Sequence, residues 1–385
     1  MKSIITKFGL LAVLVCSTCN ASTKKQNDTH ALKDAIASHT KPKQYIKVAL
    51  LLDTSNSMDG LIDQAKAQLW EIVNELSYAK CDENKPYLEI ALYEYGNDNL
   101  NGAEGYIRQV LSFSKDLDEI SKHLFSLTTK GGNEYCGQVI TTALNQLQWN
   151  NNPDDLKLIF IAGNEPFTQG KISYKTASKL ASNKDITVNT IFCGDYDQGI
   201  SSFWKDGADL ANGNYIAINH NKTTAYVATP YDDEILKYNK KLNETYVTYN
   251  RIGQQKMQLQ AEQDDNAKGY SNANAVSRTV SKSSHLYKNS AWDLVDASDD
   301  EDFKYENLKE NELPDELKNK SKKEIKAYVS KKKEERKFIQ KKIQDLNISR
   351  KQFILKQQKE DVNGLENAMI QAIKTQAKHK NYKWN

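Results

Sequence analysis

The sequence predicts an α/β protein with a doubly wound, mostly parallel β-sheet, followed by a charged, helical C-terminal region. Short, nearly continuous apolar segments recur in the first part of the chain, which is typical of strands buried on both faces. Segments with helical spacing of apolar residues lie between them, an alternation that favours parallel strands joined by crossover helices. Toward the C-terminus the sequence becomes lysine-rich while it keeps a helical pattern, which predicts the helical region.

The α/β domain is predicted over residues 45–222. Its first strand is expected at Ile46–Leu52, where Lys47 interrupts an otherwise apolar run, and its first helix begins at Asp59 and has helical spacing as far as Leu76. By the same criteria the remaining strands are expected at residues 87–95, 106–113, 156–161, 186–192 and 214–218. The remaining helices are expected at residues 117–124, 137–147, 174–181 and 202–210.

The composition excludes several classes of protein. With 17 Gly and 6 Pro in 385 residues, the chain is neither collagen-like nor a Gly- and Pro-rich disordered protein. The 53 basic and 50 acidic residues leave a net charge of +3, which gives no reason to expect nucleic acid as a partner. Five cysteines in a chain of this length exclude a disulfide-dense scaffold.

The N-terminus has the pattern of a signal peptide. Lys2 and Lys7 precede the apolar run Phe8–Val15, which is too short to span a bilayer. We therefore expect residues 1–21 to be a signal peptide and the protein to be exported to the periplasm or the cell surface. The mature chain is expected to have no transmembrane segment, because no later stretch is apolar enough.

Two ways of processing this signal are open. Cleavage after Ala21 fits the preference for small residues at the cleavage site, and residues 22–44 would then form a linker. The alternative is a lipoprotein anchored at Cys16 or Cys19. In both cases the protein is exported.

The loop after the first strand has the pattern of a metal site. It reads Asp53-Thr54-Ser55-Asn56-Ser57, an Asp-x-Ser-x-Ser motif at the carboxyl end of a buried strand, where ligands of such sheets bind. One carboxylate and two hydroxyls suit a hard cation that keeps part of its water shell, as Mg²⁺ does. Capping of the following helix is the alternative interpretation, but it explains a single side chain of the three. We predict that Asp53, Ser55 and Ser57 bind Mg²⁺ or Mn²⁺.

Four segments of the α/β domain are similar to motifs of one known family: Ala49–Met58, Gly131–Glu134, Phe160–Pro166 and Ala208–Tyr215. In these segments residues 45–222 resemble the von Willebrand factor type A (VWA) domain. The resemblance implies a Rossmann-type fold and a metal-ion-dependent adhesion site, in which the ion bonds to an acidic side chain of a partner. It also implies that Asp53, Ser55 and Ser57 are the first motif of that site. The whole chain resembles exported bacterial proteins with a VWA domain ahead of a Lys-rich helical tail.

The second and third loops depart from the family pattern. The family usually has Thr after the Gly131-Gly132 pair and Thr-Asp-Gly in the third loop, where this chain has Ala162-Gly163-Asn164. The family's Asp therefore falls on Gly163, and a weak ion site is expected. The neighbouring side chains offer other oxygen atoms, and the further candidate ligands are Asn133, Glu134, Asn164 and Glu165.

The sequence has no enzyme signature. Gly-x-Ser-x-Gly, Gly-x-x-x-x-Gly-Lys and His-Glu-x-x-His are all missing, and the six histidines are scattered without ligand spacing. We therefore predict a protein that is not an enzyme and has no catalytic residue.

Three cysteines follow the signal segment, and export permits disulfides. Cys136 begins a helix after the second loop, and Cys193 ends the fifth predicted strand, so both are expected on the side of the sheet that carries the site. Cys81 follows the first long helix. We predict a disulfide between Cys136 and Cys193.

Two regions follow the α/β domain. Residues 223–298 form a polar connecting region with helical periodicity at Ile235–Gln263, a Ser- and Asn-rich stretch at Gly269–Ser284 and an apolar patch around Trp292. Residues 299–385 form a charged helical tail.

The main helix of the tail is predicted over residues 321–360. Ser321 and Glu324 have the spacing of a capping box, and no Pro or Gly follows before Gly364. A coiled-coil heptad seam runs along it, with apolar Ile325, Val329, Ile339, Ile343, Leu346 and Phe353 interrupted by Lys332, Arg336 and Arg350.

The three basic seam positions argue against a tight coiled-coil dimer, because a buried unpaired charge is costly. We expect the apolar stripe to pack on the helix around Met369 or on the region around Trp292, with the Lys-rich face in solvent. We also expect the α/β domain to fold without residues 318–385.

These patterns together predict an exported binding or adhesion protein. Its VWA-like domain is expected to bind a protein or an acidic envelope ligand, with a divalent ion at the Asp-x-Ser-x-Ser loop. The alternative is a structural or scaffolding protein of the cell envelope that binds without metal.

Overall fold

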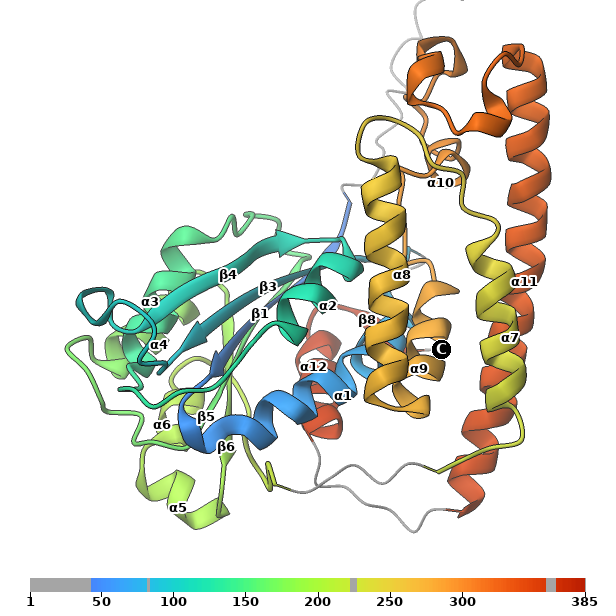
Figure 1. Cartoon of the computed structure of the whole chain (residues 1–385). Helices are drawn as coiled ribbons and strands as arrows, with labels where there is room; N and C mark the ends of the chain where they lie inside the picture. Colours follow the sequence, from blue (N-terminus) through green and yellow to red (C-terminus); the bar gives the residue numbers. More distant parts are fainter. Residues whose placement is uncertain (1–42, 82–83, 222–226, 358–364, 385) are drawn as a thin grey trace, which may run out of the picture. The chain divides into compact units, whose positions relative to one another are not determined.

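A six-stranded sheet forms the centre of the α/β domain (Figure 1). Its strand order is β4-β3-β1-β5-β6-β7, and all neighbours are parallel except β3 and β4. This confirms the predicted doubly wound, mostly parallel sheet. The strands are β1 Tyr45–Asp53, β3 Tyr87–Tyr95, β4 Ile107–Ser114, β5 Leu156–Gly163, β6 Thr187–Cys193 and β7 Tyr215–Ile218.

The computed structural model describes residues 43–81, 84–221, 227–357 and 365–384. The predicted signal peptide, with Cys16 and Cys19, and the linker as far as residue 42 lie outside these residues. Residues 43–385 form one compact unit. No helix among the described residues has the length and apolar character needed to cross a membrane.

Alternation along β1 explains why the sheet is covered on both faces. Val48 and Leu52 belong to one buried apolar cluster, and Ala49 and Leu51 belong to another on the opposite face. The first cluster includes α1 Asp59–Leu76, α2 Leu117–Phe125 and α12 Leu365–Lys378. The second includes α3 Cys136–Gln146, α4 Tyr174–Asn183 and α6 Trp204–Asp209.

Two predicted helical segments differ from the structure in their bounds. The helix expected at residues 202–210 corresponds to α6, and it is preceded by α5 Tyr196–Ser201, which the sequence pattern does not predict. Phe203 separates the two helices because its backbone is left-handed, with φ of 70°. The periodic segment at 235–263 contains α7 Asp232–Asn243 and the start of α8 Gly253–Tyr270. Asn250, with φ of 60°, lies in the turn before α8.

The Ser- and Asn-rich stretch contains a helix that its apolar pattern did not reveal. This helix, α9 Asn272–Lys282, is capped by Ser271, which accepts a hydrogen bond from the Asn274 N–H. It packs on α1 through polar contacts: Asn74 Nδ2 lies 3.1 Å from Ser277 Oγ, and Asn74 Oδ1 accepts from Ser281 Oγ at 2.6 Å. Hydrogen bonds replace apolar contacts on this face, so hydrophobic periodicity is a poor guide here.

The long helix of the tail is α11 Lys322–Gln357, close to its predicted bounds. The capping box is confirmed, since the Ser321 N–H donates to Glu324 Oε2 at 2.8 Å and the Glu324 N–H lies 3.3 Å from Ser321 Oγ. The main contacts of this helix are with α7, α9 and α10 Leu294–Ala297, near Trp292.

The basic seam residues of α11 are paired, which the sequence did not indicate. The Arg336 guanidinium, 4% exposed, reaches the Asp293 carboxylate at 2.6 Å and that of Asp296 at 2.9 Å. Arg350 reaches Asp232 at 3.0 Å. The interruptions of the heptad seam therefore connect α11 to the preceding regions.

The C-terminal segment belongs to the core of the α/β domain. Met369 and Ile373 of α12 are buried in the same cluster as α1, and α12 also contacts β5. Strand β8 Tyr382–Trp384 pairs antiparallel with β2 Ala79–Cys81. The expectation that residues 318–385 form a dispensable tail does not fit these contacts.

Candidate metal site at the carboxyl end of the sheet

Three loops meet where the central strand ends. Asp53 is the last residue of β1 and stands opposite Tyr95, the last residue of β3, in the parallel register. On the other side, Leu52 is opposite Ala162 of β5, so Gly163 lies next to Asp53. Because these strands are parallel, the loops after β1, β3 and β5 lie at one edge of the sheet.

The Asp53 carboxyl group is fully buried at this edge. Its Oδ1 accepts a hydrogen bond from the Ser55 N–H at 2.8 Å, whereas its Oδ2 has no hydrogen-bond partner among the described residues. The pKa of Asp53 is raised to about 8. Burial is the main cause, and the neighbouring Glu134 and Glu165 carboxyl groups also raise it. A buried carboxyl oxygen without a partner is uncommon and points to a missing proton or cation.

The two serines of the motif lie beside this carboxyl group. Ser55 is buried and Ser57 is exposed, and their Oγ atoms are 3.3 Å apart. The Asn164 Nδ2 of the third loop donates to Ser57 Oγ at 3.1 Å. The first and third loops are therefore in direct contact through candidate ligands.

Glu134 is the candidate of the second loop that reaches the buried part of the site. It is 6% exposed. Its pKa is raised to about 7, mainly by burial and also by the nearby Glu165 carboxyl group. A Cβ atom on Gly96 would lie 2.8 Å from Asp53 Oδ1 and 2.9 Å from Glu134 Cγ, so both acidic side chains border this glycine. Gly96 has φ of 79°, and an L side chain there would be strained as well as crowded.

The other two candidates lie farther out. Asn133 is exposed, and among the described residues its side chain has no hydrogen bond to the motif. Glu165 is half-buried, and its Oε2 accepts from Gln169 Nε2 at 3.2 Å. Its backbone carbonyl accepts from Trp204 Nε1 at 2.8 Å, which ties the third loop to α6.

Tyr95 explains why position 163 has no side chain. A Cβ atom on Gly163 would lie 2.6 Å from Tyr95 Oη and 3.0 Å from Asp53 Oδ2. The Tyr95 hydroxyl donates to the Ala162 carbonyl at 3.0 Å and is fully buried. The tyrosine side chain thus takes the space that an aspartate at this position would enter.

The loop after β3 also belongs to this edge of the sheet, although none of its residues is among the predicted ligands. Asn97, 3% exposed, donates through Nδ2 to the carbonyl groups of Thr54 at 3.3 Å and Thr128 at 2.9 Å. It joins the first loop to the second. The available signal was the polar Gly96-Asn97-Asp98 segment directly after a buried strand that pairs with β1.

The predicted disulfide between Cys136 and Cys193 is absent from the structure. Both residues are buried free thiols near the site. Cys136 Sγ lies 3.9 Å from Tyr95 Oη, and burial raises the pKa of both thiols above their usual range. The two cysteines fill apolar space under the loops, which explains their position at the sheet edge without a covalent bond.

The donor set fits a hard cation in part. Asp53, Ser55, Ser57 and Glu134 offer carboxylate and hydroxyl oxygens, and the Asp53 Oδ2 is available for a ligand bond. Among the described residues, however, no group of three or more His, Cys, Asp and Glu side chains is close enough to hold a metal by itself. An ion here would rely on the hydroxyl groups and on water or a partner's oxygen for its remaining ligands.

The raised pKa of Asp53 predicts that the metal-free protein loses stability as the pH rises. The carboxyl titrates at about 8 in the fold against an ordinary value of 3.8, so the fold holds this proton more tightly than the unfolded chain. The free energy of unfolding therefore falls as the pH rises toward 8, by about 2 kcal/mol between about pH 6 and pH 8. Urea unfolding in the presence of EDTA measures this loss. Asp53→Asn should show a smaller loss, and equal losses in the two proteins would contradict the prediction.

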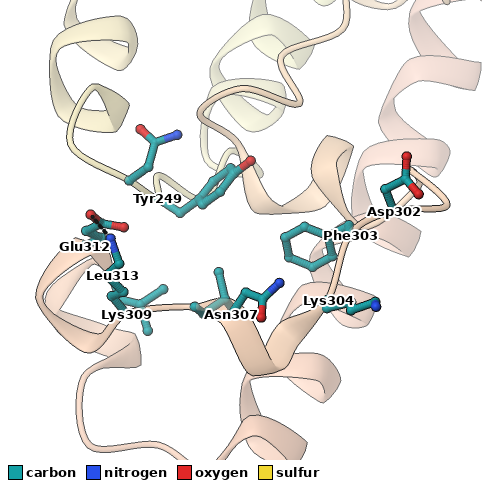
Figure 2. A pocket seen from close by; sticks show the side chains of 10 residues that line it. Tyr249, Asp302, Phe303, Lys304, Asn307, Lys309, Glu312 and Leu313 are labelled. Atoms are coloured by element: carbon teal, nitrogen blue, oxygen red, sulfur yellow. Dashed lines mark hydrogen bonds and ion pairs between the residues drawn. The ribbon is translucent and has the colours of Figure 1, made fainter.

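A cavity lies outside this site (Figure 2). The cavity has a volume of about 190 Å³ and lies between Tyr249 and the turns of residues 302–313. Phe303, Leu308 and Leu313 give it an apolar wall, whereas its rim carries both acidic and basic side chains. It contains none of the predicted site residues. Because its rim carries both acidic and basic side chains, it favours neither an anionic nor a cationic ligand.

One known family of domains matches this chain. The family model of the von Willebrand factor type A domain matches residues 47–233. A comparison with curated proteins gave no match.

Several solved structures are similar to part of this chain. The VWA domain of SpRpn10 is 14% identical, with 45% of this chain and 87% of that chain covered and a TM-score of 0.34. The conserved hypothetical protein BatB from Bacteroides thetaiotaomicron is 16% identical, with 45% and 90% covered and a TM-score of 0.35. Proximal thread matrix protein 1 from the mussel byssus, with a zinc-occupied MIDAS motif, is 12% identical, with 47% and 43% covered and a TM-score of 0.36.

The family match covers the strands and loops that build this edge of the sheet, and it extends beyond the predicted boundary at residue 222 to the start of α7. Residues 47–233 of this chain are therefore a von Willebrand factor type A domain.

Proposed function

We propose that this protein is an exported binding protein whose VWA domain binds a protein or an acidic envelope ligand through a divalent cation, Mg²⁺ or Mn²⁺. Domains of this family commonly mediate protein interactions, some of them through metal sites. The observation that carries the proposal is the buried Asp53 carboxyl group, whose Oδ2 has no hydrogen-bond partner among the described residues. The hydroxyl of Ser55 lies next to this carboxyl group, and the hydroxyl of Ser57 is 3.3 Å from that of Ser55.

Each residue has a defined part in this proposal. Asp53 and Ser55 hold the ion from the buried side, and Ser57 supplies a neutral oxygen on the solvent side. Glu134 lies close enough to balance the charge directly or through water. A bound cation supplies an open coordination position for a carboxylate of the partner, and it removes the mutual repulsion of the acidic side chains.

The surface next to the site suits a protein partner. Tyr196 and Ile200 are one turn apart on α5, and Phe203 follows the end of this helix; all three are exposed, Tyr196 by 53%. The α5–α6 turn is hydrogen-bonded to the third loop, since the Phe167 N–H donates to the Ser202 carbonyl at 3.0 Å. An apolar patch beside an acidic site is a feature of protein-interaction surfaces.

Removal of the Asp53 carboxylate tests the metal site. In Asp53→Ala we expect the affinity for Mg²⁺ or Mn²⁺ to fall by at least about tenfold, because the buried ligand is lost. Isothermal titration calorimetry measures the affinity, with Asp154→Ala as a matched control, since Asp154 is exposed and lies before β5 at the opposite edge. Equal binding by the wild type and Asp53→Ala would contradict the proposal.

A metal-independent scaffolding protein is the second candidate. Two observations favour it: Tyr95 fills the space of a third-loop aspartate, and the described residues hold no cluster of three metal-ligating acidic, His or Cys side chains. Capture of partners from an envelope extract with and without EDTA separates the two functions. Loss of capture in EDTA supports the ion-dependent function, whereas unchanged capture supports the scaffold.

We also propose export and a non-enzymatic role. The charged and apolar pattern of residues 1–21 supports export, and the lack of a catalytic motif in the sequence supports the non-enzymatic role. N-terminal analysis of the mature protein tests the first point: a chain beginning at Ser22 indicates ordinary cleavage, and a lipid-modified Cys16 or Cys19 indicates an anchored lipoprotein.

A further inference from the structure

Helix α11 has one face that is fully used by the fold. Ile325 and Val329 are buried against Val247 and Leu294, and Ile339 and Ile343 are buried in the main apolar cluster. Figure 1 shows α11 running beside α7, with which it has its most extensive contact. The apolar heptad seam of α11 is therefore buried within this chain and is not available to pair with another helix.

The opposite face of α11 is exposed and strongly basic. Over residues 326–357 its exposed acidic residues are Glu334 and Asp345. The exposed lysines over the same residues outnumber them three to one and are Lys326, Lys331, Lys337, Lys341, Lys342 and Lys356. We name this surface, from residue 326 to residue 356, the outer face.

The outer face also carries apolar side chains that the fold leaves in solvent. Phe338, Ile348 and Leu355 are 60%, 54% and 77% exposed, which makes them the most exposed large apolar side chains among the described residues. Lys341, Ile348 and Leu355 are seven residues apart, so they lie along one line of the helix, and Phe338 is one turn before Lys341. Lys342 Nζ lies 5.7 Å from the centre of the Phe338 ring.

Alternating lysine and large apolar side chains match a specific kind of surface. A second copy of the same face would bring lysines against lysines, which opposes self-association. An acidic soluble partner would satisfy the lysines but not the apolar side chains. A bilayer surface with anionic lipids satisfies both, because it has negative headgroups directly above hydrocarbon.

We propose that the outer face of α11 binds the surface of an anionic lipid bilayer, with the helix lying parallel to the membrane. The lysines contact the headgroups, and Phe338, Ile348 and Leu355 enter the boundary between the headgroups and the acyl chains. The face is about 45 Å long at 1.5 Å per residue, so it can contact many lipids at once. The buried pairing of Arg336 with Asp293 keeps the other face of the helix on the protein.

Vesicle sedimentation tests this inference. The experiment uses the chain from residue 22, which keeps the compact unit of residues 43–385 and lacks the apolar run Phe8–Val15. Vesicles of phosphatidylcholine alone are compared with vesicles that also contain phosphatidylglycerol. We expect binding to the anionic vesicles only, weakened by added salt, because exposed charges are screened.

Two variants and a matched control separate the contributions. Changing Lys337, Lys341 and Lys342 together to Gln should weaken binding about 100-fold, since each lysine near an anionic surface contributes about fivefold. Changing Phe338, Ile348 and Leu355 together to Ser should weaken binding at least about tenfold. The control changes three exposed lysines elsewhere to Gln, namely Lys122, Lys171 and Lys179, and should bind as the wild type does.

Each contrary result overturns the inference. Equal binding to both kinds of vesicle, or an equal loss in the control, would show that the outer face is not the binding surface. Full vesicle binding by the serine variant would show that the lysines act alone, as they would toward a soluble anionic polymer. Circular dichroism of each variant checks that its fold is intact, which is expected because every changed side chain is exposed.

Discussion

A chain that ends at Gln357 is expected not to fold. The deletion removes α12 and β8, whose Leu365, Met369, Ile373 and Tyr382 are buried in the main apolar cluster with α1. Each buried side chain of this size contributes about 1.5–3 kcal/mol. Their sum is comparable with the whole stability of a typical domain, about 5–15 kcal/mol.

Soluble expression and the far-ultraviolet circular dichroism melt measure this effect. A matched pair of point variants controls for the deletion itself: Ile373→Ala should lower the free energy of unfolding by about 2–5 kcal/mol, and Thr375→Ala, at an exposed position of the same helix, should change it by less than about 0.5 kcal/mol. A truncated protein that melts cooperatively near the wild-type temperature would show that the VWA domain folds without its C-terminal helix.

Replacement of Arg336 by Met is expected to lower the free energy of unfolding by about 3–5 kcal/mol. Asp293 is fully buried and would lose its charged partner, while Asp296 would lose a contact of 2.9 Å. Thr245 would also lose two hydrogen bonds, one from Nε to its hydroxyl at 3.0 Å and one from Nη2 to its carbonyl at 2.7 Å. Chemical denaturation at neutral pH measures the change.

The neighbouring Lys337 provides the control. It is exposed and pairs with Glu334 on the surface, so Lys337→Met should change the free energy of unfolding by less than about 1 kcal/mol. The double variant Arg336→Met/Asp293→Asn should be less destabilised than the two single changes summed, because no unpaired carboxylate remains at position 293. Similar stability of Arg336→Met and the wild type would refute the role of this ion pair.

Local sequence was enough to predict the first loop of the site. Asp53, Ser55 and Ser57 are within five residues of one another, and the buried strand before them sets where they lie. Glu134 and Asn164 followed from the loops that the family resemblance aligned, and the structure brings both to the same edge as Asp53. By contrast, Tyr95 and Gly96 touch Asp53 because of the register between β1 and β3, which no local pattern specifies.

The same dependence on tertiary packing explains why the predicted disulfide between Cys136 and Cys193 is wrong. Cys136 and Cys193 were expected at the correct edge of the sheet, and both are near Asp53 in the structure. A disulfide needs Cα atoms within about 7 Å and matching Cβ directions. Those quantities depend on how α3 and β6 pack. The sequence could therefore predict that both cysteines lie at this edge of the sheet, but not whether they form a disulfide.

Sequence patterns were sufficient to predict the α/β class, the positions of the strands along the chain, the Asp-x-Ser-x-Ser loop and the capped start of α11, because each depends on residues a few positions apart. The folded structure was needed to show that serines of α9 contact α1, that Arg336 and Arg350 pair with buried acidic residues, and that α12 is part of the same apolar core as α1. These contacts join residues far apart in the chain. Their energies depend on burial and on which opposite charge or polar group the fold brings near, and these properties exist only once the chain is folded.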